Sequence, residues 1–223
     1  MKLVIFGATG MIGHGALLEA LDSDEVEHVL SVGRKKAEVE HAKLEQIEHA
    51  DFEDFFAIAH RFSDRDGCLW CLGTSSAGMD EATYRRITVD FTLAAARVMV
   101  AQNPSMHVCF LSGAGARTDG KGAMWARVKG EAETAVQALG FAGVTVFRPA
   151  SIKPLRGAKP RGAMMKITYG LTNVFDPLIR MAGLGTSTVE VGRAMVAAVA
   201  GRSDATILDS AAINVLAAKP ASS

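Results

Sequence analysis

The sequence has little cysteine, no long apolar run and no excess of charge of either sign. Three cysteines among 223 residues do not make a disulfide framework, which favours a reducing compartment. No uninterrupted apolar stretch approaches the roughly 20 residues that a membrane-spanning helix needs. The first apolar run, residues 3–6, is too short for a secretory signal and meets a glycine turn at once. These absences predict a cytoplasmic protein with no membrane span.

The charge of the chain is balanced, because 24 Lys and Arg residues are matched by 24 Asp and Glu residues. A neutral chain lacks the electrostatic signature of a protein that binds nucleic acid or an acidic membrane, so neither is expected as a partner. Cys68 and Cys71 have CxxC spacing, but in a strand they would point to opposite faces, and the sequence offers no second ligand pair. The six histidines show no metal-ligand spacing, so no metal site is expected. A small-molecule substrate remains as the expected partner.

Short apolar runs alternate with longer segments of helical periodicity along the chain. Strands are expected at residues 3–6, 28–32, 44–49, 67–72, 107–111 and 144–147, and helices at 11–21, 80–101, 121–139 and 189–200. Asp80 is the candidate N-cap of the second helix. This alternation predicts an α/β fold with a doubly wound, mostly parallel Rossmann sheet in a single domain, residues 1–223.

The pattern changes after the sixth expected strand. Residues 153–162 are basic and rich in Pro and Gly, which predicts a loop, and residues 163–182 follow as a helix broken at Pro177. We therefore interpret residues 150–190 as a small C-terminal helical cap that covers the substrate region.

Three glycines separate the first strand from the first helix in the run Gly7-Ala8-Thr9-Gly10-Met11-Ile12-Gly13. In a Rossmann fold such glycines permit a tight turn, close approach of a pyrophosphate, and close packing of helix on strand. The free N–H groups of the helix N-terminus also favour an anion. The spacing is GxxGxxG, not the standard GxGxxG, and three turn glycines without a ligand are the alternative. The position of the turn favours a dinucleotide.

The second expected strand is followed by Arg34 and Lys35, where NAD-binding sites usually carry an acidic residue. A guanidinium at that place can bind the 2′-phosphate of NADP(H) through two hydrogen bonds. The residues therefore favour NADP(H) over NAD(H), and a solvated basic turn is the alternative.

Taken together, the sequence is similar to the extended and atypical short-chain dehydrogenase/reductase superfamily. The resemblance covers roughly residues 1–200 and is greatest to its Tat-interacting oxidoreductase-like, NADPH-binding group. It is carried by the segments Val4-Ile5-Phe6-Gly7-Ala8-Thr9-Gly10, Asp51-Phe52, Cys71-Leu72-Gly73-Thr74, Val89-Asp90, Phe110-Leu111-Ser112, Val128-Lys129-Gly130-Glu131 and Phe147-Arg148-Pro149. Besides the glycine turn, Arg34 and Lys35, it implies cofactor contacts from Asp51, Phe52, Cys71, Leu72, Gly73, Thr74, Val89, Lys129, Arg148, Pro149 and Ala150.

The resemblance also implies a catalytic site around Ser112 and Lys129. In the family a serine orients the substrate carbonyl, and the lysine holds the nicotinamide ribose and lowers the pKa of a tyrosine four residues before it. Trp125 stands at that position here. An indole N–H only donates a hydrogen bond, whereas a positioned general acid contributes about 10²–10⁴ in rate. Tyr84 is either a replacement acid or a residue of the surface or a subunit contact.

Plainer interpretations of the two implied catalytic residues stay open. Ser112 could be a polar strand end bonded to a loop amide, and Lys129 an exposed helix lysine.

Three functions remain open at this stage. The first is an atypical NADP(H)-dependent reductase that transfers hydride to a small carbonyl, quinone or flavin acceptor. The second is a non-catalytic NADP(H)-binding, redox-sensing module, and the third is a sugar-nucleotide epimerase or dehydratase. A homodimer is expected by analogy, because the helices after the fourth and fifth strands form dimers in many relatives.

Overall fold

The structure is a computed structural model that describes residues 1–158, 179 and 181–220. All but residues 179, 181 and 182 of the expected helix at 163–182, together with its break at Pro177 and most of the expected cap, therefore lie outside the described residues. The glycine turn and the other segments that the sequence singled out lie within them.

A sheet of seven parallel strands forms the centre of the molecule, in the order β3-β2-β1-β4-β5-β6-β9. Its strands are β1 (Lys2–Phe6), β2 (His28–Gly33), β3 (Leu44–Glu48), β4 (Gly67–Trp70), β5 (His107–Leu111), β6 (Gly143–Arg148) and β9 (Ile207–Asp209). The order reverses beside β1, and such a switch point opens a crevice at the carboxyl ends of the strands. The predicted doubly wound Rossmann sheet is confirmed.

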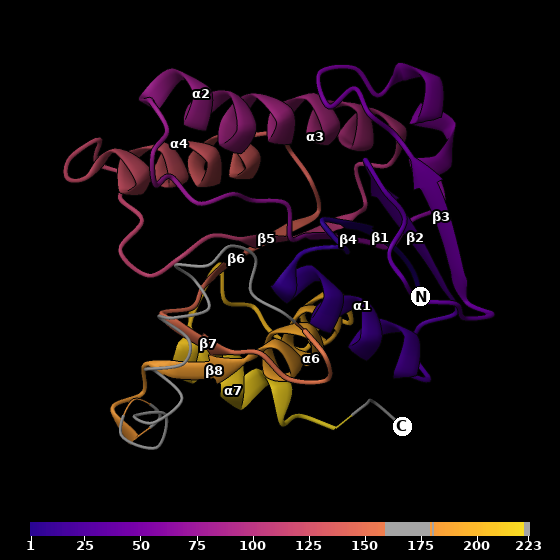
Figure 1. Cartoon of the computed structure of the whole chain (residues 1–223). Helices are drawn as coiled ribbons and strands as arrows, with labels where there is room; N and C mark the ends of the chain where they lie inside the picture. Colours follow the sequence, from indigo (N-terminus) through magenta and orange to yellow (C-terminus); the bar gives the residue numbers. More distant parts are fainter. Residues whose placement is uncertain (159–178, 180, 221–223) are drawn as a thin grey trace.

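Helices cover both faces of the sheet (Figure 1). One face carries α1 (Met11–Asp22), α6 (Thr188–Val199) and α7 (Ser210–Ala217). The other carries α2 (Glu81–Arg85), a π-helical turn η2 (Arg86–Asp90), α3 (Phe91–Gln102), α4 (Met124–Gln137) and a 3-10 segment η1 (Phe56–Phe62). Alternate residues of β1 enter the two cores, because side chains of a strand point to opposite faces. Leu3 and Ile5 pack on one side, and Val4 and Phe6 on the other.

The helix expected at 80–101 forms, but it is not continuous. Asp80 caps α2 as predicted, and its Oδ1 accepts the N–H of Thr83 at 2.9 Å. The turn η2 then interrupts the α-helical ladder and buries Thr88 and Val89. The helix expected from residue 121 begins only at Met124, after Gly120 and Gly122 adopt positive φ.

Several short elements were not expected from the sequence. Strands β7 (Ser151–Lys153) and β8 (Gly185–Ser187) form a separate parallel pair, so Lys153 ends a strand and does not begin the expected loop. The edge strand β9 leads into α7, whose cap Asp209 accepts the N–H of Ala212. Strands of three residues carry too little periodicity to stand out in a sequence.

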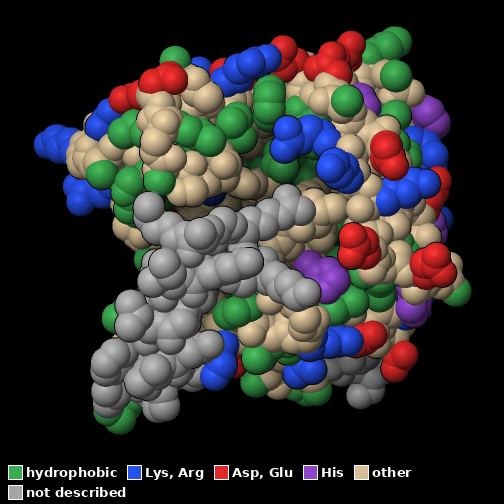
Figure 2. Space-filling view, viewed as in Figure 1, with side chains coloured by type: hydrophobic (Ala, Val, Ile, Leu, Met, Phe, Trp, Pro, Cys, Tyr) green, Lys and Arg blue, Asp and Glu red, His purple; other side chains and the backbone are tan. Residues whose placement is uncertain are grey.

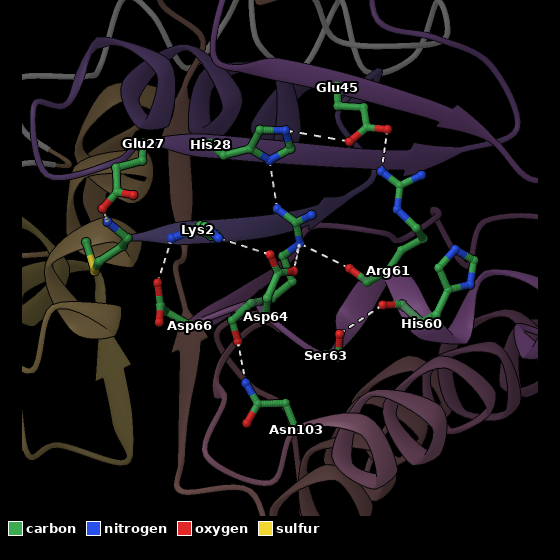
Figure 3. Close-up of polar contacts among 12 residues, drawn as sticks. Lys2, Glu27, His28, Glu45, His60, Arg61, Ser63, Asp64, Asp66 and Asn103 are labelled. Carbon is green, nitrogen blue, oxygen red and sulfur yellow. Dashed lines mark hydrogen bonds and ion pairs between the residues drawn. The ribbon is translucent and has the colours of Figure 1, made fainter.

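A polar network closes the amino end of the sheet, opposite the glycine turn (Figure 3). Arg65 is 5% exposed and donates a hydrogen bond to Nδ1 of His28 at 2.7 Å. On its other side, Nε2 of His28 lies 3.6 Å from a carboxylate oxygen of Glu45. Asn103 donates to the carbonyl of Arg65, which joins the end of α3 to the network.

On the face shown in Figure 2, Lys and Arg side chains are interspersed with Asp and Glu over the layer of α2, α3 and α4. This mixture matches the balanced charge of the chain. Among the helices that the structure describes, none combines the length and the apolar character needed to cross a membrane.

Candidate active site

The glycine turn between β1 and α1 is shaped by two close backbone approaches. Gly7 has a φ of +81°, and a Cβ on it would lie 2.6 Å from the carbonyl oxygen of Cys71. A Cβ on Gly13 would lie 2.1 Å from the carbonyl oxygen of Gly7. Side chains at these two positions would push α1 away from β1 and the turn away from β4. The turn therefore depends on glycine for packing as well as for conformation.

Gly10 has a different environment, which leaves the start of α1 open. Its backbone is extended and donates to the carbonyl of Gly7 at 2.8 Å, and a Cβ on it would meet only that oxygen, at 3.2 Å. No side chain caps α1, and its first turn has no acidic residue. The first N–H groups of a helix need partners from outside the helix, and they favour an anion.

A cleft of about 630 Å³ opens in front of this turn. It is lined at the carboxyl ends of β1, β2 and β4 by Gly7, Ala8, Thr9, Gly10, Ser31, Val32, Gly33, Arg34, Lys35, Phe52, Cys71, Leu72 and Gly73. The sequence had singled out all of these except Ser31, Val32 and Gly33. Those three belong to the strand that ends before Arg34, so the strand assignment itself was the signal that could have found them.

The basic pair after β2 lies at the rim of the cleft. Arg34 and Lys35 are exposed, and the described residues provide no hydrogen-bond or ion-pair partner for the guanidinium of Arg34. Phe52 is 4% exposed and packs edge-on against Phe6 and Phe55. Asp51, its neighbour, is exposed outside the cleft, and its Oδ1 accepts the N–H of Glu53. The cleft thus combines an unneutralised cation with an apolar wall.

Ser112 follows β5 and holds a polar atom without a protein partner. Its N–H donates to the carbonyl of Phe147 at 2.8 Å. Its Oγ is buried and has no hydrogen-bond partner among the described residues. A buried hydroxyl without a partner costs about 1–3 kcal/mol, so this hydroxyl is a candidate contact for a ligand atom.

Lys129 reaches from α4 to the same strand end. Its Nζ donates to the carbonyl of Leu111 at 3.3 Å, and it lies 3.8 Å from where a Cβ on Gly73 would stand. Burial lowers the pKa of Lys129 to about 8, and the nearby carboxylate of Glu133 opposes part of that shift. The alternative interpretation of Lys129 as an exposed helix lysine is wrong, because its ammonium group lies toward the ends of β4 and β5.

Trp125 lies one helical turn before Lys129 on α4. Its side chain is 37% exposed, and its ring edge is 3.2 Å from the Cβ position of Gly115, in the loop that leaves Ser112. Tyr84 is only 2% exposed in the core beneath α4, so its interpretation as a surface or subunit-contact residue is wrong. Burial raises the pKa of Tyr84.

The remaining predicted contacts are not brought to the cleft. Thr74 lies beyond the cleft lining, and Val89 is buried in the core of η2. Arg148 binds Glu133 through two nitrogens. Pro149 accepts the N–H of Ala114, and Ala150 donates to Oγ of Ser210. Three further residues belong to the turn or first turn of α1 without lining the cleft, namely Met11, Ile12 and Gly13.

The parallel order of the sheet and the glycine turn at its switch point define a protein of the Rossmann class. No family model matches the chain. Protein HTATIP2 of Rattus norvegicus is 31% identical over 150 residues, which are 66% of this chain and 61% of that protein. The mitochondrial protein FMP52 of Meyerozyma guilliermondii is 23% identical over 151 residues, 67% of this chain and 64% of that protein. The chain thus matches less than two thirds of the length of these relatives.

Solved structures share the fold at low sequence identity. MoeE5 in complex with UDP-glucuronic acid and NAD has a TM-score of 0.67 at 15% identity, covering 94% of this chain and 76% of that one. A short-chain dehydrogenase/reductase family oxidoreductase of Burkholderia thailandensis has a TM-score of 0.64 at 15% identity, covering 95% and 92%. With the relatives above, these likenesses support the predicted resemblance to the atypical NAD(P)-binding group of the short-chain dehydrogenase/reductase superfamily.

Proposed function

We propose that this chain binds NADP(H) in the cleft beside the glycine turn and transfers hydride to a small acceptor beside Ser112 and Lys129. The observation that carries the proposal is the cleft itself. It joins an uncapped helix N-terminus to an unpaired arginine at the end of β2. The structural neighbour MoeE5, which is described in complex with NAD, supports a nicotinamide cofactor.

The residues present fit such a cofactor. The N–H groups at the start of α1 would hold the pyrophosphate, since Gly10 leaves room for it. Arg34, with Lys35 beside it, would pair with the 2′-phosphate. Lys129 would donate to the nicotinamide ribose, and the reduced nicotinamide ring supplies the hydride. The 2′-phosphate contact is the reason to favour NADP(H) over NAD(H).

Ser112 would orient the acceptor by donating its unpartnered hydroxyl to an acceptor oxygen. Trp125 would stand where the family carries its catalytic tyrosine, and its indole cannot exchange a proton in the useful pH range. The acceptor would be a carbonyl, a quinone or a flavin. A carbonyl would receive little help with its proton, because a positioned acid contributes about 10²–10⁴ in rate.

Trp125 also favours a second candidate function, a non-catalytic NADP(H)-binding module that senses the redox state of the cofactor. A sugar-nucleotide epimerase or dehydratase ranks lower. MoeE5 is described with UDP-glucuronic acid, but that likeness concerns the fold alone.

Wider features of the protein are proposals of the same kind. They are a single domain over residues 1–223 with a substrate cap at 150–190, a homodimer, and a cytoplasmic location. A relative that is named as mitochondrial leaves the location open to either compartment.

Replacing Arg34 with Ala tests the cofactor assignment. We expect Arg34→Ala to weaken NADPH binding at least tenfold and to leave NADH binding nearly unchanged, because only NADPH carries the 2′-phosphate. Isothermal titration calorimetry with both cofactors measures this difference. Arg97→Ala removes an exposed arginine of α3 as the matched control. Equal weakening of both cofactors by Arg34→Ala would contradict the role of Arg34 as the phosphate-binding residue.

A further inference from the structure

The two tryptophans of the chain have opposite environments. Trp70 in β4 is 1% exposed, and its ring centroid lies 4.5 Å from that of Phe6. Trp125 is 37% exposed and lies at the start of α4. Tryptophan combines a large apolar face with an N–H donor and is enriched where proteins contact ligands and partners. The partly exposed indole of Trp125 is therefore a candidate ligand contact.

The position of Trp125 places it beside the proposed reaction site. It precedes Lys129 by four residues on α4, so both side chains lie on the same stripe of the helix. The edge of its ring lies 3.2 Å from the point where a Cβ on Gly115 would stand, so this glycine, with a φ of +88°, leaves room for the indole. Gly115 follows Ser112 by three residues, and the Oγ of Ser112 is buried without a partner. Trp125 and Lys129 on α4 and the loop from Ser112 to Gly115 thus border the proposed site, and the indole supplies an aromatic face on that border.

Apart from the Lys129 ammonium, which the proposed function assigns to the nicotinamide ribose, acidic groups are scarce in the described part of this site. Glu133 is held by Arg148 through two nitrogens. Burial raises the pKa of the Cys71 thiol to about 12. An acceptor that takes hydride without a proton from the protein suits such surroundings better than a simple carbonyl.

We propose that Trp125 is a stacking platform for the acceptor, and that the site takes planar conjugated rings that accept two electrons, as quinones and flavins do. This inference rests on the proposed function and names its substrate class. The ring would lie on the indole, with one of its oxygen or nitrogen atoms toward the Ser112 hydroxyl. The acceptor gains, as hydride, the two electrons that NADPH loses, and water supplies the proton that completes the reduced ring.

Binding without turnover tests the stacking role. The protein is saturated with NADP⁺ and titrated with menadione in one arm and with FMN in the other. Affinity is measured by calorimetry and indole contact by fluorescence. Stacking of a conjugated ring on an aromatic side chain strengthens binding severalfold to about a hundredfold, so we expect Trp125→Leu to weaken ring binding about tenfold. Trp125→Phe should weaken ring binding less while abolishing the fluorescence quenching, because Trp70 stays buried. Neither variant should alter NADP⁺ affinity.

Phe56→Leu is the matched control, since it removes an aromatic side chain that is 83% exposed and does not line the cleft. If only menadione or only FMN binds saturably, the result shows whether the acceptor is a quinone or a flavin, and it supports the platform. The platform is wrong if neither ring binds, if Trp125→Leu binds both as tightly as the native protein, or if Phe56→Leu has the same effect. Failure of NADP⁺ to bind would instead refute the proposed function, while Trp125-dependent ring binding would still support the platform.

Discussion

The buried carboxylate of Glu133 in α4 forms an ion pair with the partly exposed Arg148 at the end of β6, with Oε1 3.1 Å from Nε. The carboxylate side chain is 1% exposed and lies one helical turn beyond Lys129. This single acid therefore fixes α4 to the sheet and also raises the pKa of Lys129 against the effect of burial. Stability and the charge of the proposed cofactor-binding lysine are coupled through it.

We expect Glu133→Gln to have two separable effects. Breaking a fully buried pair costs about 3–5 kcal/mol, and the partial exposure of Arg148 together with the retained amide should bring the loss below that range. Loss of the carboxylate would also lower the pKa of Lys129 below about 8. The affinity for anionic NADPH should fall as pH rises through the pKa of Lys129, so the midpoint of that fall should move to lower pH.

Urea unfolding and NADPH affinity between pH 6 and 10 measure these two effects. Glu131→Gln is the control on the same helix, because Glu131 pairs with Arg85 at the surface, where ion pairs contribute about 0–1 kcal/mol. A Glu131→Gln variant that loses as much stability as Glu133→Gln would refute the special role of the buried pair.

Local motifs explain which parts of this molecule could be predicted from sequence. The glycine turn, the cap at Asp80 and the strand ends at Arg34 and Ser112 each depend on neighbouring residues, and the structure has them where they were expected. The pairing of Glu133 with Arg148 joins a helix to a strand through the fold, and no local pattern carries it. The close approach of the Trp125 ring to Gly115 also joins two separate segments, and no local pattern predicts it.

Ser112 and Ser187 offer a test of the unpartnered hydroxyl. Oγ of Ser187 is buried and accepts the N–H of Glu190 at the start of α6, whereas Oγ of Ser112 has no partner among the described residues. We expect Ser187→Ala to cost about 1 kcal/mol, as loss of a helix cap does. Ser112→Ala should leave the free energy of unfolding unchanged or slightly raised.

The rate of hydride transfer should depend on the two serines in the opposite way from stability, with the larger loss in Ser112→Ala. Loss of a hydrogen bond to the acceptor oxygen should lower kcat by about 10²-fold in Ser112→Ala and leave Ser187→Ala close to native. Denaturant melts together with NADPH oxidation assays give both quantities. A large loss of stability in Ser112→Ala would mean that its hydroxyl already has a structural partner.

Alanine substitutions at Gly13 and Gly10 should distinguish the glycine that the packing of the turn needs from the glycine that cofactor binding needs. A Cβ at Gly13 would collide with the backbone of Gly7, so Gly13→Ala should destabilise the protein by about 1–3 kcal/mol, as overpacking does. A Cβ at Gly10 would meet only the carbonyl oxygen of Gly7, at 3.2 Å, which a small shift of the turn relieves. Gly10→Ala should therefore lose less stability than Gly13→Ala while it loses NADPH affinity. The interpretation of the turn as a pyrophosphate cradle fails if Gly10→Ala binds NADPH like the native chain.

The lowered pKa values of two histidines predict that the protein loses stability in mild acid. Burial lowers the pKa of His28 and of His107, and the guanidinium of Arg65 lowers that of His28 further, while Glu45 and Asp64 act in the opposite direction. Below the unfolded value of about 6.5, the unfolded chain binds more protons than the folded one, so stability falls as pH drops. Protonation also removes the acceptor that Arg65 uses on His28 (Figure 3).

Chemical denaturation between pH 5 and 8 measures this effect. His28→Gln and His107→Gln should each flatten part of the slope, and His60→Gln, at an exposed position, is the control. A slope that neither buried variant changes would assign the acid sensitivity to other groups.

The last prediction concerns the residue at the family's tyrosine position. Trp125→Tyr would place an ionisable hydroxyl four residues before Lys129, whose positive charge favours the phenolate. If Ser112 and Lys129 are otherwise arranged for catalysis, this substitution should raise the reduction of aldehydes and ketones by about 10²–10⁴-fold. Trp125→Phe, which is aromatic but carries no hydroxyl, is the control and should gain nothing. NADPH oxidation with a panel of carbonyls measures the gain. If Trp125→Tyr still binds NADPH but reduces no carbonyl, residue 125 does not stand at the acid position, and the tryptophan is not what limits carbonyl reduction.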